Sequence, residues 1–159
     1  MRIILEPIGV VRNSRQATGD DYWGGVVSEI IINEPLGEES LRGIEEFSHA
    51  EVIFYFHLVD ERKIITGVRH PRNNPLWPEV GILAQRGKNR PNRLGLSVVR
   101  IIRREGNKIY VSGLDAIDGT PVLDIKPVMK EFLPRDDVRQ PRWSTELMAE
   151  YWKDVSGEE

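Results

Sequence analysis

Val52-Ile53-Phe54-Tyr55-Phe56-His57 indicates the fold class of this 159-residue chain, because its β-branched and aromatic side chains point alternately to two faces. One face carries Val52, Phe54 and Phe56, and we expect it in the core. The opposite face ends at His57, where it can border a binding site. The stretch therefore predicts a strand near Glu51–Leu58 with one face buried.

Further short apolar runs, separated by Gly, Pro, Asn and Asp, predict six more strands. We place them at Ile3–Arg12, Val26–Ile32, Val80–Arg86, Leu94–Arg104, Lys108–Leu114 and Pro121–Pro127. The connection Glu105-Gly106-Asn107 has the length of a hairpin, so its flanking strands should be antiparallel. Helical segments are short, at 35–44 and at Ser144–Trp152, where Ser144 is a candidate N-cap. The pattern favours an all-β barrel or sandwich with peripheral helices.

Several function classes are excluded by composition and motif. The chain has no cysteine, and its three histidines (His49, His57, His70) lack the spacing of a helix-borne zinc site, so no metal is expected. Neither a phosphate-binding glycine loop nor a nucleophile elbow occurs. We also expect a single compact domain in the cytoplasm without a membrane partner, because no signal-peptide pattern and no apolar run of about 18 residues is found.

Positive charge is concentrated in one part of an otherwise acidic chain. The net charge is −3, yet nine Lys and Arg residues face one acid, Glu79, between Arg69 and Arg104. Such a segment can attract an anion, although alternating arginines on a solvated strand edge would give the same pattern.

Two turns and two long loops are the candidate functional segments. Residues 84–95 crowd four cations around glycine and proline, a pattern that an anionic ligand would neutralise. Residues 114–127 carry Asp115, Asp118 and Asp124, which suit hydroxyl and ammonium groups. The long loops Asn13–Trp23 and Arg69–Glu79 have the length typical of binding loops. We expect the arginine-rich and aspartate-rich turns to meet in space.

Five blocks in chain order resemble the TrmO (TsaA-like, YaeB-like) family of tRNA-modification enzymes. They are Pro7-Ile8-Gly9-Val10-Val11-Arg12, Gly43-Ile44-Glu45-Glu46-Phe47-Ser48-His49-Ala50, His70-Pro71-Arg72, Asn89-Arg90-Pro91-Asn92-Arg93-Leu94-Gly95-Leu96-Ser97 and Asp115-Ala116-Ile117-Asp118-Gly119-Thr120-Pro121-Val122-Leu123-Asp124-Ile125-Lys126-Pro127. The resemblance implies a small single-sheeted β-barrel over residues 1–135, a helical extension over 136–159, S-adenosylmethionine as cofactor and a homodimer. It also implies N-methylation of N6-threonylcarbamoyladenosine in the tRNA anticodon loop.

The resemblance also assigns site residues by position. Cofactor contacts are expected at Tyr22, Trp23, Gly24, His57, Leu58, Arg86, Leu96, Asp115, Ala116, Ile117 and Asp118. Substrate contacts are expected at His70, Arg72, Lys88, Arg90, Asn92 and Arg93. For catalysis, Arg86 or Arg90 would favour a deprotonated acceptor nitrogen, and His57 or Asp118 would take the proton.

Some positions depart from the family pattern. Gln85, Gly87, Lys88, Arg93 and Leu94 replace its usual residues around the arginine-rich turn, and Val128 stands where tyrosine is usual. The methyl acceptor therefore stays open: another RNA base, a small metabolite, or none if the chain only binds S-adenosylmethionine. The additional carboxy-terminal domain of longer family members is not found in the sequence, so we expect the barrel or its dimer to hold tRNA.

Overall fold

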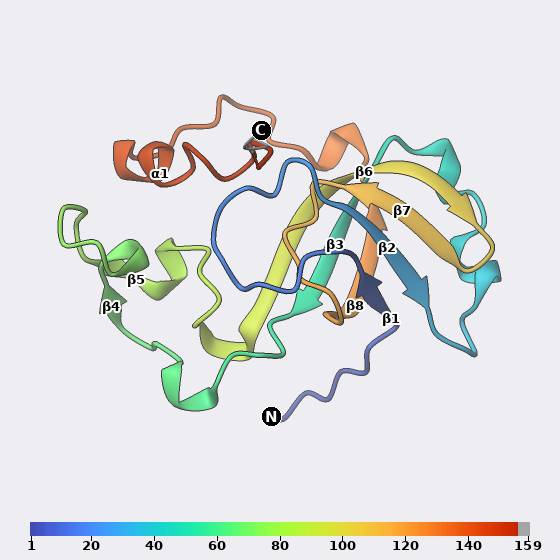
Figure 1. Cartoon of the computed structure of the whole chain (residues 1–159), viewed down its shortest axis with the longest axis horizontal. Coiled ribbons are helices and arrows are strands. Elements are labelled where there is room, and N and C mark those ends of the chain that lie inside the picture. The colour runs from blue at the N-terminus through green and yellow to red at the C-terminus, as the bar shows by residue number, and fades with distance from the viewer. Residues whose placement is uncertain (156–159) are drawn as a thin grey trace.

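A computed structural model describes residues 1–155, in which six strands close into one antiparallel barrel (Figure 1). The strands are β1 (Gly9–Arg12), β2 (Val27–Ile32), β3 (His49–Tyr55), β6 (Leu94–Glu105), β7 (Lys108–Ser112) and β8 (Pro121–Pro127). Their order around the barrel is β1-β2-β7-β6-β3-β8, and β8 pairs with β1 to close it. The expectation of an all-β, single-sheeted barrel is confirmed.

Strand alternation fills the barrel interior as the sequence predicted. In β3, Ala50, Val52 and Phe54 are buried, whereas Ile53 and Tyr55 between and after them are only partly covered. Phe56 lies at the rim of the core and packs edge-to-face on Phe54, with ring centroids 5.4 Å apart. Most of the other buried strand side chains are aliphatic, including Val11, Ile30, Val99, Ile109, Val111 and Val122, and Ser28 and Ser97 are buried among them.

The predicted hairpin is also confirmed. Strands β6 and β7 are antiparallel, and Glu105 pairs with Lys108 across a two-residue turn. Gly106 opens that turn with φ +58°, a left-handed conformation that glycine adopts without the cost of a side chain.

Several predicted strands are too long: those predicted at Glu51–Leu58 and Lys108–Leu114 end at Tyr55 and Ser112, and two others are shorter still. The strand predicted at Ile3–Arg12 begins only at Gly9, since Pro7 has no N–H to donate and the exposed residues before it have no sheet partner. The strand predicted at Val80–Arg86 stops at Gly81: β5 (Val80–Gly81) pairs with β4 (Val68–Arg69) outside the barrel. A 3-10 turn, η5 (Ile82–Ala84), follows instead.

Helices are short and peripheral, as expected. Single 3-10 turns are η1 (Glu38–Leu41), η2 (Ile44–Glu46), η3 (Glu61–Lys63), η4 (Pro71–Asn73), η6 (Pro91–Arg93) and η7 (Lys130–Phe132). The one α-helix of the described residues, α1 (Arg142–Leu147), begins after Pro141, so the predicted N-cap at Ser144 is wrong. The Ser144 hydroxyl donates to the Pro141 carbonyl from inside the first turn. No described helix has the length and apolarity needed to cross a membrane, and residues 156–159 of the predicted extension lie outside the described part.

Barrel closure gathers three connections at one end. Because neighbouring strands run in opposite directions, the chain leaves β1, β3 and β7 at the same end of the barrel. The connections there are residues 13–26, 56–93 and 113–120, and we call this end the loop end. It faces left in Figure 1, toward β4, β5 and α1, while the β6–β7 hairpin lies at the right.

Gly95→Ala is expected to destabilise the barrel, because a methyl group at this position would run into the Phe54 ring. Overpacking of this kind costs about 1–3 kcal/mol of unfolding free energy, measurable by urea denaturation. Gly67→Ala is the matched control, since its methyl group would meet open space and should change stability by less than about 0.5 kcal/mol. Equal stability of the two variants would contradict the packing described here.

Candidate functional site

The arginine-rich and aspartate-rich turns meet at the loop end, on strand β6. An Arg86 guanidinium nitrogen donates to the Leu96 carbonyl at 2.6 Å. The hydroxyl of the next residue, Ser97, donates to Asp115 Oδ1. Because Leu96 and Ser97 are adjacent, a cation from the β3–β6 connection and a carboxylate from the β7–β8 connection lie within a few residues of the same strand. The two turns therefore contact adjacent residues of one strand.

A second cluster surrounds Asp118. The Asn13 backbone N–H donates to Asp118 Oδ1 at 3.1 Å, and an Arg12 guanidinium nitrogen lies 3.8 Å from Oδ2. A methyl group placed on Gly119 would lie 3.9 Å from His57 Nε2 and 4.0 Å from Arg12 Nη1. His57 and Asp118, the two predicted proton acceptors, therefore come from different connections into one neighbourhood.

The third aspartate of the predicted set lies elsewhere. Asp124 belongs to β8 rather than to the 113–120 connection, and its carboxylate pairs with Lys126 at 2.9 Å. Asp124 is thus set apart from the connection that carries Asp115 and Asp118. Being on a strand, Asp124 is fixed by sheet register and cannot move with the loop that carries Asp115 and Asp118.

The cations of the arginine-rich turn differ in their partners. Arg86 and Arg90 donate to backbone carbonyls, those of Leu96 and Gln85, both at 2.6 Å. Lys88 approaches the Thr18 carbonyl at 3.3 Å. A carbonyl oxygen has no net charge, so it does not neutralise the cation that donates to it. These three cations can therefore attract an anion at the loop end.

Two other predicted substrate contacts hold the protein's own loops together. Arg72 makes a two-pronged contact with Asp21, at 2.9 and 3.1 Å, and so ties the two long loops to each other. Arg93 donates to the Val59 carbonyl and to Glu61, with its guanidinium 4.8 Å from the centre of the Tyr55 ring. In this arrangement both guanidinium groups already have partners.

The remaining predicted residues line the same end of the barrel. His70 Nδ1 lies 2.6 Å from the Trp77 carbonyl oxygen and braces the proline-bearing loop. Asn92 is exposed, with φ +62°, and Leu58 is exposed at 63%. Ala116 is buried, and Ile117 next to it is partly covered.

The 22–24 segment is covered from outside by the carboxy-terminal residues. Trp23 is 4% exposed, with Arg15 4.0 Å above its ring centre, so its aromatic face is closed to a ligand. The backbone N–H groups of Tyr22, Trp23 and Gly24 donate to the carbonyls of Glu150, Tyr151 and Lys153, at 3.2, 2.8 and 3.3 Å.

Tyr151 is a contact of the site that the sequence analysis missed. Its hydroxyl donates to Asp115 Oδ2, so each oxygen of this carboxylate has a hydroxyl donor. Burial, and after it the negative charge of Asp115, raise the pKa of the Tyr151 phenol above its ordinary value. The tyrosine therefore stays a neutral donor. Its only signal in the sequence was an apolar helical spacing over 144–152, which gives no indication of a polar partner.

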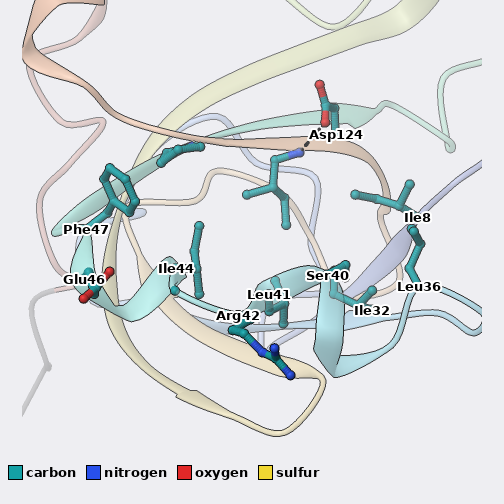
Figure 2. A pocket seen from close by; sticks show the side chains of 13 residues that line it. Ile8, Ile32, Leu36, Ser40, Leu41, Arg42, Ile44, Glu46, Phe47 and Asp124 are labelled. Atoms are coloured by element: carbon teal, nitrogen blue, oxygen red, sulfur yellow. Dashed lines mark hydrogen bonds between the residues drawn. The ribbon is translucent and has the colours of Figure 1, made fainter.

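A cavity of about 580 Å³ lies away from these residues (Figure 2). Its walls come mainly from the connection after β2 and from β8, including Leu41, Ile44, Phe47 and Ile125. None of the predicted site residues lines it. Arg42, Glu46 and Asp124 are the charged residues of its lining, so the cavity draws on other side chains than the loop end does.

The chain is similar to known proteins in both sequence and structure. The family model "tRNA-methyltransferase O N-terminal domain" matches residues 15–133. A human tRNA (adenine(37)-N6)-methyltransferase is 40% identical over 70% of this chain, but the match covers only 24% of the human protein. A probable S-adenosyl-L-methionine-binding protein of Pyrococcus abyssi is 40% identical over 87% of this chain and 75% of its own. The crystal structure of TrmO from Pseudomonas aeruginosa superposes with a TM-score of 0.71, at 30% identity, over 87% of this chain and 61% of that one.

Alkaline conditions are expected to weaken the fold through Tyr151. Because its pKa is raised in the folded state, its stabilising contribution is complete below the ordinary tyrosine value and is lost as the pH rises above it. Between about pH 9 and pH 11 the unfolding free energy of the parent protein should fall more steeply than that of Tyr151→Phe. Urea titrations at each pH measure both slopes, and parallel slopes would show that Tyr151 titrates normally.

Proposed function

Since the chain belongs to the tRNA-methyltransferase O family, whose model matches most of it, we propose that it is an S-adenosylmethionine-dependent tRNA methyltransferase. Its acceptor in this proposal is N6 of N6-threonylcarbamoyladenosine in the anticodon loop. The observation that carries the proposal is that Arg86 and Asp115 contact adjacent residues of β6, Leu96 and Ser97. A cation and a carboxylate held this way match the two charged ends of the cofactor's amino-acid part.

The residues of the loop end fit this cofactor chemically. S-adenosylmethionine offers a carboxylate, an ammonium group, ribose hydroxyls and a cationic sulfur. Arg86 supplies a donor for the carboxylate, and Asp115 and Asp118 supply acceptors for the ammonium and hydroxyl groups. Exposed Leu58 and Leu96 offer apolar surface for the adenine ring. Trp23 is enclosed, so contacts in the 22–24 segment would use Tyr22 or the main chain.

The protein's own groups would then prepare the acceptor. The bound cofactor supplies an electrophilic methyl group, and a urea-like nitrogen attacks it readily only after losing its proton. Arg90 at the loop end favours the anionic form of that nitrogen, and His57, beside Gly119, accepts the proton. Asp118 is held by Asn13 and Arg12 and so suits a binding role better than proton transfer. Holding the reacting atoms in line lowers the barrier by up to about 7–11 kcal/mol.

Binding of tRNA follows from the same charges. In this proposal Lys88 and Asn92 contact tRNA phosphates, and Arg90 on the same connection serves the acceptor base. In this proposal Arg72, Arg93 and His70 shape the loops that tRNA meets, with cytoplasmic tRNA as the partner. A homodimer is part of the proposal, supported by the outward side chains of Leu94, Leu96 and Val98, which are 37–51% exposed on β6.

Methyl transfer from labelled S-adenosylmethionine tests which nucleoside is the acceptor. We expect the purified protein to transfer one methyl group to threonylcarbamoyladenosine in tRNA from cells that lack this methylation, read by mass spectrometry of nucleosides. The matched control is tRNA from cells that also lack the threonylcarbamoyl group, which should gain no label. Label on another nucleoside would redirect the proposal to that base, and binding without any transfer would leave a cofactor-binding module.

Arg90→Ala is expected to lower methyl transfer about 10²-fold or more, because the acceptor anion loses its nearby cation. Cofactor affinity, measured by calorimetry, should stay within about twofold, since Arg90 is assigned to the acceptor. Arg42→Ala removes an arginine at the opposite end of the barrel, where η1 follows β2, and serves as the control. Unchanged turnover in Arg90→Ala would remove this residue from the mechanism.

A further inference from the structure

The carboxy-terminal residues 142–155 form a strap that touches three separate loops of the site. Trp77 of the proline-bearing loop donates its indole N–H to Glu146 at 3.0 Å. The 22–24 segment adds its backbone hydrogen bonds, and Tyr151 reaches Asp115. Figure 1 shows the strap crossing above the loop end. All of these strap residues lie beyond residue 133, where the family match ends.

Asp115 depends on such contacts for its orientation. It lies in the β7–β8 connection, outside any strand or helix, so the backbone alone leaves its side chain free to rotate. Ser97 on rigid β6 holds Oδ1 and Tyr151 on the strap holds Oδ2. With one donor on each oxygen, the plane of the carboxylate is fixed.

The two donors leave the carboxylate able to bind a ligand. Both are neutral hydroxyl groups, so the negative charge is not cancelled, as it would be by an arginine. An ionised carboxylate has about four acceptor positions, and two of them stay open.

We propose that Tyr151 is a positioning residue that orients Asp115 for cofactor binding and that the strap completes the site. The inference rests on the proposed S-adenosylmethionine-binding function and adds to it an element outside the matched family region. Tyr151 acts through Asp115 and touches no reacting atom. The strap is thereby a working part of the site, and the segment that links the Tyr22, Trp77 and Asp115 loops.

Tyr151→Phe tests this role by removing a single oxygen atom. The dissociation constant for S-adenosylmethionine, from calorimetry on the full chain, should rise about 10- to 100-fold, the usual effect of losing a hydrogen bond to a charged group. KM for the cofactor should rise in parallel, with kcat at saturation little changed. Tyr110→Phe removes the same atom from β7 and should leave the affinity within about twofold.

A double-mutant cycle separates positioning from general damage. In an Asp115→Asn background, Tyr151→Phe should cause little further loss, because its effect runs through the aspartate. Glu146→Ala, on the exposed side of the strap, keeps the test open if Tyr151→Phe folds poorly, and should weaken binding a few-fold by releasing Trp77.

The outcomes are distinct. If the parent protein binds no S-adenosylmethionine, the proposed function fails. If the parent binds and Tyr151→Phe binds equally well, only the positioning role fails. Tighter binding by Tyr151→Phe would also overturn it and make the strap an obstruction.

Discussion

Antiparallel closure of the six-stranded barrel is the constraint on which the rest of the structure depends. Each strand of the barrel runs opposite to both of its neighbours. The connections after β1, β3 and β7 therefore leave from the same end. Residues far apart in sequence, such as Asn13 and Asp118, or Ser97 and Asp115, are neighbours for this reason. The aliphatic core thus determines which polar groups can meet.

The arginines of the loop end fall into two groups according to their hydrogen-bond partners. Arg72 with Asp21 and Arg93 with Glu61 join segments of the chain, while Arg86 and Arg90 rest on uncharged carbonyls. Counting charges in the sequence shows the cluster but not this division. An arginine with a carboxylate partner stabilises a loop, and one held only by carbonyls keeps its charge available to a ligand.

The sequence predicted the barrel well because a period of two is a local property, visible in Val52–Phe54 and in the Gly106 hairpin. It failed where pairing partners decide, as at Ile3, which has strand-forming side chains but no neighbouring strand. The meeting of the two turns was foreseen, but the partners of Arg72 and Trp23 were not, because each comes from a distant loop. Tyr151 was missed since its hydroxyl bond to Asp115 spans 36 residues and leaves no periodic trace.

The connection between β3 and β6 departs from Tyr55 and returns at Leu94, two residues that face each other in the sheet. Thirty-eight residues (56–93) are thus inserted into what is geometrically a hairpin. The entropic cost of closing such an excursion grows only slowly with its length. The barrel can therefore carry a long segment between two paired strands at little extra entropic cost. The same segment brings His57, Arg86 and Arg90 to the loop end without disturbing the pairing of β3 with β6.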